Sequence, residues 1–123
     1  MHLFQSGRFT GTSGGELPFK IECDALTRAD YDTLAEIVAM QHIFSEVHGV
    51  PRGGVPFADS LRPYCSRQGR VLIVDDVLTT GGSMERFRSR LGLRNDQVIG
   101  AVIFDRSGGQ CPDWIKPIFT LNM

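Results

Sequence analysis

Several features are scarce in this chain of 123 residues, and each scarcity argues against a class of protein. No apolar run approaches the roughly 18 residues that a membrane-spanning helix needs, and the first residues do not form a signal peptide. Basic residues show no excess, because the net charge is −1, which disfavours a nucleic-acid or membrane partner. We therefore expect a cytoplasmic protein that binds neither nucleic acid nor a membrane.

Cysteine is also scarce. Cys23, Cys65 and Cys111 are odd in number, lie far apart and form no C-x-x-C pair, so the sequence predicts neither a disulfide framework nor a zinc site. We interpret them as buried or free thiols in a reducing compartment.

Several catalytic motifs are missing. His2, His42 and His48 form no H-E-x-x-H pattern, and the chain has no G-x-S-x-G elbow, no G-x-x-x-x-G-K-[ST] loop and no G-x-G-x-x-G fingerprint. These absences argue against a zinc protease, a serine hydrolase, a Walker-type kinase and a dinucleotide-binding enzyme. We expect His42 to lie in a helix as a packing or surface residue.

Strand-like and helix-like segments alternate along most of the chain. Thr27 can cap a helix whose apolar stripe contains Leu34, Ile37, Val38 and Phe44. After it, the sequence predicts strands at 46–50, 71–74, 98–104 and 118–121 and helices at 55–65 and 84–91. This order is typical of a single-domain α/β fold with a mainly parallel sheet flanked by helices.

The first 26 residues have a different character. They mix short apolar segments with Gly, Ser and one Pro, which predicts a small irregular N-terminal hood over 1–26, with one or two short antiparallel strands that include 19–23. Residues 27–123 then form the core of the one domain. Because a chain of this length buries only a small core, we expect a homodimer.

The most informative segment is VLIVDDVLTTGGSM, residues 71–84. Val71 to Val74 read as a strand buried on both faces, and ligands of open α/β sheets bind beyond the carboxyl ends of such strands. Asp75 and Asp76 stand at that end, and both can reach one ligand only if the strand has begun to turn there. A loop of Thr79, Thr80, Gly81, Gly82 and Ser83 then leads into a helix, and such a loop offers hydroxyls and backbone N–H groups to a phosphate.

The two carboxylates need a different partner from the phosphate. Ionised carboxylates accept hydrogen bonds and repel phosphate, so Asp75 and Asp76 suit a sugar diol or a magnesium ion bound to it. The simpler interpretation is an ordinary strand, turn and helix, with Ser83 or Thr80 as the helix cap.

This segment resembles the phosphoribosyl pyrophosphate (PRPP) motif of the type I phosphoribosyltransferases, which is a strand, two acidic residues and a T-T-G-G-S-like loop. The resemblance implies that Asp75 and Asp76 hold the ribose hydroxyls and that residues 79–83 wrap the 5′-phosphate. It also implies a type I phosphoribosyltransferase-like fold, and an enzyme that transfers ribose 5-phosphate from PRPP to a nitrogenous base and releases pyrophosphate. Magnesium would be bound mainly through substrate and water, with no direct protein ligand.

A second motif repeats the order of strand, glycine loop and helix. In VPRGGVPFA, Gly53 and Gly54 can present N–H groups to an anion while Arg52 adds a cation. Alone, this sequence would more often be a plain turn. In the family that it resembles, the equivalent loop binds the pyrophosphate leaving group, so Arg52 joins Asp75 and Asp76 as a residue implied to act in catalysis.

A third motif favours orotate as the base. Asp105 and Arg106 end a predicted strand, and in orotate phosphoribosyltransferases the arginine of such a pair contacts the carboxylated pyrimidine. The segment LFQSGRF resembles their L-x-S-G-R segment, with Gln5 where the family commonly has a lysine. Arg106 and Gln5 are therefore the predicted base-binding residues. The competing interpretation of Arg106 is a surface ion pair.

The chain also departs from the orotate enzymes. In those enzymes a strand and a mobile basic loop precede the VLIVDD-like strand, whereas only SRQGR intervenes here, and we expect no helix before the LFQSGRF segment. A lid of that kind excludes water and completes the site. Two alternatives therefore stay open: a non-catalytic module that binds PRPP or a nucleotide as a sensor, and an enzyme whose acceptor is a purine or another pyrimidine.

Overall fold

A four-stranded parallel sheet organises the protein. The computed structural model describes residues 1–10 and 16–121. The strands lie in the order β3-β4-β5-β6 and every neighbouring pair is parallel. Their bounds are Phe44–Gly49 for β3, Arg70–Leu78 for β4, Val98–Asp105 for β5 and Ile115–Thr120 for β6. This arrangement confirms the predicted α/β fold with a parallel sheet.

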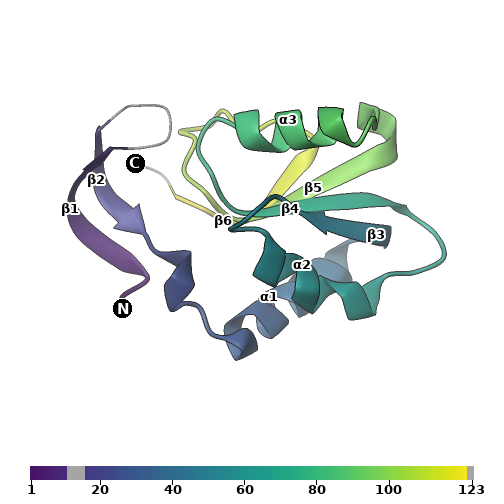
Figure 1. Cartoon of the computed structure of the whole chain (residues 1–123), viewed down its shortest axis with the longest axis horizontal. Coiled ribbons are helices and arrows are strands. Elements are labelled where there is room, and N and C mark those ends of the chain that lie inside the picture. The colour runs from purple at the N-terminus through teal and green to yellow at the C-terminus, as the bar shows by residue number, and fades with distance from the viewer. Residues whose placement is uncertain (11–15, 122–123) are drawn as a thin grey trace.

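Helices cover both faces of the sheet. Figure 1 shows α1 (Arg28–Gln41) and α2 (Val55–Leu61) on one face and α3 (Gly82–Arg90) on the other. Three short 3₁₀ helices occupy Cys23–Ala25, Arg62–Tyr64 and Asn95–Gln97. The connection from β5 to β6 has no helix among its residues, as the sequence predicted.

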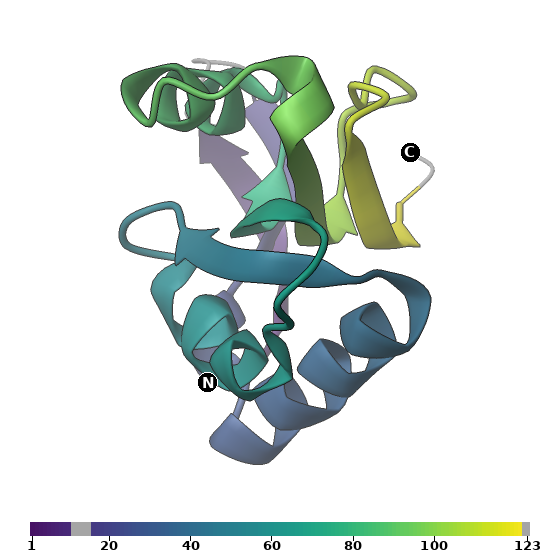
Figure 2. The same ribbon diagram turned by 90° about the vertical axis from the view of Figure 1, so that its right-hand side faces the viewer.

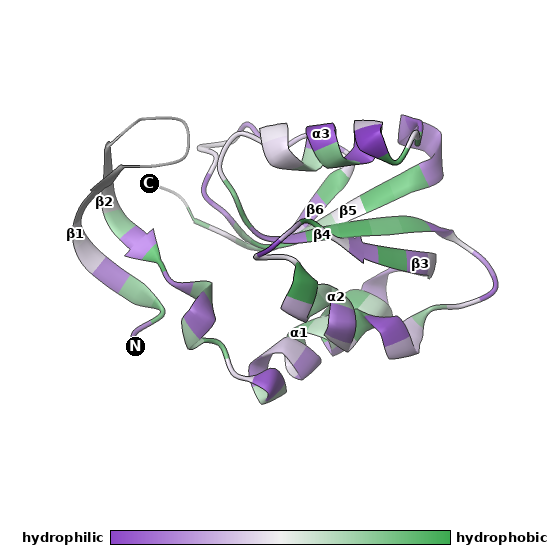
Figure 3. Cartoon of the chain, in the orientation of Figure 1, coloured by the Kyte–Doolittle hydropathy of each residue, from purple (hydrophilic) through white to green (hydrophobic). Residues whose placement is uncertain are grey.

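The alternation of side chains along β4 explains why this strand is apolar without interruption. Leu72 and Val74 belong to the hydrophobic cluster that also contains residues of α1 and α2, whereas Ile73 belongs to the cluster that contains Met84 of α3. Successive residues of a strand point to opposite faces, so a strand between two helical layers needs apolar residues at every position. Figure 3 shows this concentration of apolar residues in the central strands.

The N-terminal hood is an antiparallel hairpin. Strands β1 (Phe4–Thr10) and β2 (Glu16–Ile21) pair with Phe4 opposite Ile21, and Figures 1 and 2 show the hairpin at one end of the sheet. The Phe4 ring contacts the edge of the Phe104 ring at a centroid distance of 5.7 Å. The prediction of short antiparallel strands is confirmed for the described residues, and residues 11–15 of the predicted hood lie outside them.

The start of α1 was predicted correctly, but its end was not. Thr27 and Asp30 form a reciprocal capping box, in which each side chain accepts a hydrogen bond from the other residue's backbone N–H, at 3.1 and 2.8 Å. The helix ends at Gln41, so His42 caps it and Phe44 begins β3. The prediction that Phe44 belongs to the helical stripe is wrong, because its apolar side chain continues the stripe but packs into the core from a strand.

Several other predicted boundaries need correction. Strand β3 begins at Phe44 rather than 46, and α2 ends at Leu61 rather than 65, followed by a 3₁₀ turn. Strand β4 extends through the acidic pair to Leu78 instead of ending at 74, and α3 begins at Gly82. Strand β6 begins at 115 rather than 118.

Among the described residues, none of the helices has both the length and the apolar character needed to cross a lipid bilayer.

The buried face of β4 yields a stability prediction. Ile73 is 0% exposed and Ile43 is 69% exposed, so the same substitution tests a core position and a surface position. Ile73→Ala should lower the free energy of unfolding by about 2–5 kcal/mol, because it leaves a cavity between the sheet and α3. Ile43→Ala should change it by less than about 0.5 kcal/mol in the same urea titration. Equal effects of the two substitutions would contradict the assigned layers.

Candidate functional site

The loop between β3 and α2 is held against the end of β4. The Val50 N–H donates to the Val74 carbonyl at 2.8 Å, and the Gly54 N–H donates to the Val50 carbonyl at 2.8 Å. A Cβ on Gly54 would lie 2.8 Å from the Val50 nitrogen, so this position has no room for a side chain. The bond from Pro51 to Arg52 is cis, and the Arg52 side chain is exposed. The predicted pyrophosphate loop is therefore a tightly packed turn that presents Arg52 outward.

The acidic pair lies where β4 is still paired with β5 but no longer with β3. Strand β3 pairs with β4 only as far as Val74, whereas β5 continues to pair with β4 as far as Leu78. Asp75 and Asp76 thus lie on a strand that has lost one neighbour, which leaves room beside them for the loop from β3. The prediction that the strand turns at the pair is wrong, because pairing with β5 keeps β4 extended as far as Leu78.

Local hydrogen bonds fix the two carboxylates. The Asp76 N–H donates to Asp75 Oδ1 at 2.9 Å, and the Val77 N–H donates to Asp76 Oδ1 at 2.7 Å. Each aspartate therefore accepts a bond from the backbone of the next residue, a pattern that holds short acidic side chains close to the main chain.

The carboxylate of Asp76 lies directly against the backbone of Gly53. A Cβ built on Gly53 would be 2.7 Å from Asp76 Cγ and 2.8 Å from its Oδ1, closer than real Cβ contacts. Glycine is thus favoured at this position by close approach rather than by backbone conformation, because a Cβ would force the Asp76 carboxylate to move. The contact joins the predicted pyrophosphate loop to the predicted ribose-binding pair, although Gly53 and Asp76 lie far apart in the chain.

The closeness of the two carboxylates perturbs Asp75. Burial, followed by the negative charge of Asp76, raises the pKa of Asp75 from 3.8 to about 8. Such a raised pKa is typical of a carboxyl group that is withdrawn from water beside a like charge, a combination that is common at functional sites. A cation, or hydroxyl groups that donate to both carboxylates, would relieve this repulsion.

The third segment, residues 79–83, forms the turn into α3. Gly81 has a left-handed backbone with φ of 85° and packs against Pro112, whose Cγ would lie 3.2 Å from a Cβ at that position. The Thr80 hydroxyl accepts a hydrogen bond from the Gly82 N–H at 3.2 Å. The helix cap is Gly81, which has no side chain, rather than Ser83 or Thr80. The N–H groups of the first helical turn therefore face the loop.

Two residues that the sequence analysis did not select lie near the acidic pair. Cys23 is buried, and desolvation together with the charge of Asp76 raises the pKa of its thiol to about 12. The Tyr31 hydroxyl donates to the Cys23 carbonyl at 3.2 Å, and burial raises the pKa of Tyr31 to about 12. The end of the hood thus lies within electrostatic range of the acidic pair. No local sequence pattern links Cys23 to Asp76, because the two residues lie far apart in the chain.

Arg106 ties the hood to the core. It is buried, its Nη1 donates to the Phe19 carbonyl at 3.1 Å, and its guanidinium lies 4.3 Å from the centre of the Phe19 ring. The interpretation of Arg106 as a surface residue is therefore wrong. The backbone of Arg106 also donates to Leu78 at 2.9 Å, so this arginine follows directly from the paired ends of β4 and β5.

Gln5 lies on the hairpin strand beside that contact. Its neighbour Ser6 pairs with Phe19, while Gln5 itself pairs with Lys20 and donates from Nε2 to the His2 carbonyl at 3.3 Å. Neighbours in a strand point to opposite faces, so Gln5 points away from the face on which Phe4 contacts the core. The structure therefore places Gln5 in the same hairpin as the residue that Arg106 contacts, but on the other side of it.

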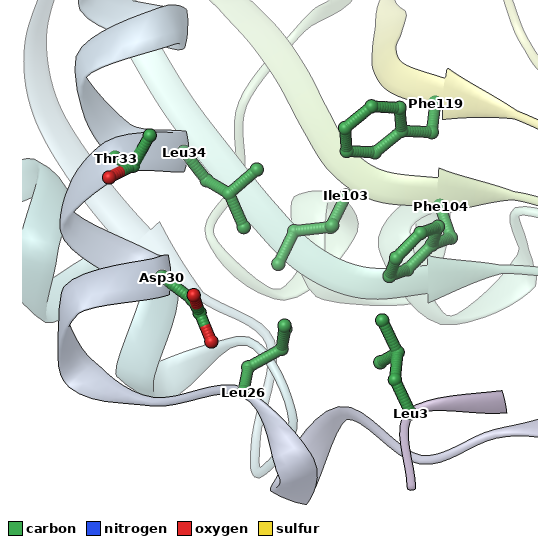
Figure 4. A pocket seen from close by; sticks show the side chains of 8 residues that line it. All are labelled: Leu3, Leu26, Asp30, Thr33, Leu34, Ile103, Phe104 and Phe119. Carbon is green, nitrogen blue, oxygen red and sulfur yellow. The ribbon is translucent and has the colours of Figure 1, made fainter.

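A separate hollow lies between the hood, α1 and the sheet. Figure 4 shows its lining, which is mostly apolar: Leu3, Leu26, Asp30, Thr33, Leu34, Ile103, Phe104 and Phe119. Its volume of about 230 Å³ is below the roughly 300–1,000 Å³ of ordinary small-molecule pockets. None of the sequence-predicted site residues lines it, so we place the candidate site at the ends of β3 and β4.

The contact between Gly53 and Asp76 yields a stability prediction. Gly53→Ala should lower the free energy of unfolding by about 1–3 kcal/mol, because the added methyl group overlaps the carboxylate. In the background of Asp76→Ala, which removes that carboxylate, the same substitution should cost less than about 0.5 kcal/mol. Urea unfolding of the four proteins measures this coupling. Equal costs in the two backgrounds would show that the loops do not touch.

The perturbed Asp75 carboxyl yields a prediction of pH dependence. Its pKa is higher in the folded protein than in the unfolded chain, so the folded state holds the extra proton between about pH 4 and pH 8. Stability should therefore fall as the pH rises through this window. Asp75→Asn should flatten that slope in thermal unfolding measured at several pH values, whereas Asp113→Asn, at an exposed loop position, should leave it. An unchanged slope in Asp75→Asn would contradict the assigned cause.

Comparisons with known proteins agree with this geometry at the level of the fold. No protein-family model and no curated protein matches the sequence. Among solved structures, the orotate phosphoribosyltransferase of Aeropyrum pernix matches with a TM-score of 0.73 and 24% identity, over 96% of this chain and 88% of that one. The orotate phosphoribosyltransferase of Mycobacterium tuberculosis, in complex with inorganic phosphate, matches with 0.67 and 20%, over 95% and 88%.

A purine enzyme also matches. The adenine phosphoribosyltransferase (APRTase) of Giardia lamblia, complexed with 9-deazaadenine, has a TM-score of 0.58 and 15% identity, over 95% of this chain and 94% of that one. The similarity therefore extends over nearly the whole chain at low sequence identity. The protein has the fold of the type I phosphoribosyltransferases, with structures of orotate enzymes prominent among its matches.

Proposed function

We propose that this protein is a phosphoribosyltransferase that transfers ribose 5-phosphate from PRPP to a nitrogenous base, with an orotate-like pyrimidine favoured. The observation that carries the proposal is the contact of Gly53 with Asp76, because it unites an anion loop and an acidic pair in one site. The shared fold supports the same function, since orotate and adenine phosphoribosyltransferases have it.

The reaction would be a displacement at C1 of the ribose. A ring nitrogen of the base forms the new bond to C1, and the bond from C1 to the pyrophosphate oxygen breaks with its electron pair. The nitrogen loses its proton, and free pyrophosphate leaves. No protein nucleophile is needed, so the protein acts by positioning the groups and by stabilising charge.

Different site residues would bind different parts of the ligand. Arg52 and the backbone of Gly53 and Gly54 bind the pyrophosphate as it leaves, and residues 79–83 bind the 5′-phosphate. Asp75 and Asp76 accept hydrogen bonds from the two ribose hydroxyls. Hydroxyl donors stabilise the charged form of a carboxyl group, so binding of the diol should lower the raised pKa of Asp75.

Magnesium fits this arrangement. Asp75 and Asp76 offer oxygen atoms, which this cation prefers, and their mutual repulsion favours a positive charge beside them. The described residues contain no group of three or more His, Cys, Asp or Glu side chains placed to hold a metal. Most magnesium ligands would then come from substrate and water. Bound magnesium would neutralise charge on the pyrophosphate as it departs.

The base would lie near Arg106 and the hood. Arg106 remains the proposed contact for an anionic base such as orotate, and its anchoring by Phe19 would hold it at the carboxyl end of β5. The prediction that Gln5 binds the base is not retained, because Gln5 lies on the other face of that hairpin. An acceptor such as adenine, which carries no carboxylate, would make no use of the arginine charge.

A sensor without catalytic activity is the second candidate, and one observation favours it. The connection before β4 is short and lies at the far end of the sheet, where the Ser66 N–H donates to the Phe44 carbonyl at 2.9 Å. Strand β4 starts at Arg70, so this connection is roughly 17 Å of strand away from Asp75. It therefore cannot close over the ligand as a lid, and the lack of a lid from this connection favours binding over turnover.

Turnover with a panel of bases tests the proposal. The purified protein is incubated with PRPP, magnesium and orotate, uracil, adenine or hypoxanthine, and pyrophosphate and nucleotide are measured. We expect turnover with orotate, and the double variant Asp75→Asn/Asp76→Asn should lower kcat/KM at least about 100-fold, since it removes two charged acceptors. Asp113→Asn, on an exposed loop, serves as the control.

The other outcomes separate the candidates. Turnover with adenine instead of orotate would keep the transferase and change its acceptor. Binding of PRPP without product from any base would favour the sensor. Unchanged PRPP affinity in the double variant would contradict the proposal that Asp75 and Asp76 bind the ribose.

A further inference from the structure

A second cation lies beside the loop at residues 79–83. Arg86 follows Ser83 by three positions on α3, and its side chain folds back toward the start of the helix. Its Nη2 donates to the Ser83 hydroxyl at 3.4 Å, and a Cβ on Gly82 would lie 3.1 Å from its Nη1. The guanidinium therefore lies over Gly82 and Ser83, where any larger residue at 82 would displace it.

Glu85, the acidic residue next to Arg86, forms its hydrogen bonds with other residues. Glu85 accepts hydrogen bonds from Arg88 at 2.7 and 3.3 Å and from Trp114 Nε1 at 2.7 Å. The bonds from Arg88 are the main cause that lowers the pKa of Glu85. Arg88 thus neutralises the only acidic side chain of α3, and the bond from Trp114 fixes the helix to the loop before β6. The positive charge of Arg86 remains directed at the start of the helix.

The start of α3 already favours an anion. The Gly82 N–H is bonded to the Thr80 hydroxyl, while helix geometry gives the N–H groups of Ser83 and Met84 no acceptor within the helix. These groups carry the partial positive charge of the helix end. A phosphate held there would lie within reach of a guanidinium whose present acceptor is a neutral hydroxyl at 3.4 Å.

We propose that Arg86 binds the 5′-phosphate monoester of the ligand and makes the site selective for a 5′-phosphorylated sugar. This inference rests on the proposed function, because it takes residues 79–83 as the 5′-phosphate loop. The planar guanidinium exchanges its bond to Ser83 for two bonds to phosphate oxygens. Arg52 binds the pyrophosphate end and Arg86 binds the other end, so the two arginines hold the donor from opposite sides.

Arginine substitutions at two positions of the same helix test this role. Arg86→Ala is compared with Arg90→Ala, which removes the same charge from an exposed position one turn further along α3. Calorimetry measures the affinity of each protein for inorganic phosphate, ribose 5-phosphate, pyrophosphate and PRPP. Urea unfolding checks that both variants keep the stability of the parent protein.

The expected pattern is specific to the monoester. Arg86→Ala should weaken ribose 5-phosphate and PRPP at least about 10-fold, as expected for a charged hydrogen bond, and Arg86→Lys should recover part of that loss. Pyrophosphate affinity should change by less than about twofold in the same variant, because Arg52 and the glycine loop bind it. Arg90→Ala should leave the affinities for all four ligands within about twofold.

Equal affinities in the two alanine variants would overturn the role of Arg86 while leaving the proposed transferase intact. Binding of inorganic phosphate and ribose 5-phosphate that depends on Arg86, with no binding of PRPP, would support Arg86 and overturn the transferase. Failure of the parent protein to bind any of the four ligands would overturn both.

Discussion

The contact between the Asp76 carboxylate and the backbone of Gly53 is the constraint on which the candidate site depends. It brings the turn at residues 52–54 to within van der Waals distance of the acidic pair on the next strand, at a position where a Cβ would overlap the carboxylate. Without it, residues 52–54 and residues 75–76 would be two unrelated surface features. With it, a negative leaving group and a sugar diol can be held by one protein surface at the same time.

The sheet makes this contact possible. Strand β3 stops pairing with β4 at Val74, and β5 keeps β4 extended as far as Leu78, so the edge beside the acidic pair opens where the loop from β3 enters. Full ionisation of the pair is unfavourable, because Asp75 is half-buried and the repulsion from Asp76 adds to the desolvation that raises its pKa to about 8. That repulsion favours any ligand that brings hydroxyl donors or a cation, which connects the fold to its proposed substrate.

Features that depend on residues close together in the chain could be predicted from the sequence. The apolar run at 71–74, the glycines of both loops and the cap at Thr27 each depend on near neighbours, so the strand, the turns and the start of α1 could be predicted. Phe44 was misplaced because its apolar side chain fits a helical stripe as well as a buried strand. The burial of Cys23 beside Asp76 and the anchoring of Arg106 by Phe19 arise from distant segments, and no local pattern encodes them. The position of Arg86 over Ser83 follows from helical spacing and could have been found.

Competition between ligand fragments tests most directly whether the two loops form one site. PRPP is titrated into the protein with magnesium, first alone, then with saturating pyrophosphate, and then with saturating ribose 5-phosphate. If Gly53 and Asp76 join the loops, each fragment should weaken PRPP binding, because PRPP needs both loops at once. If only one fragment, or neither, weakens the binding of PRPP, the account is contradicted, because the two loops would then bind their ligands separately.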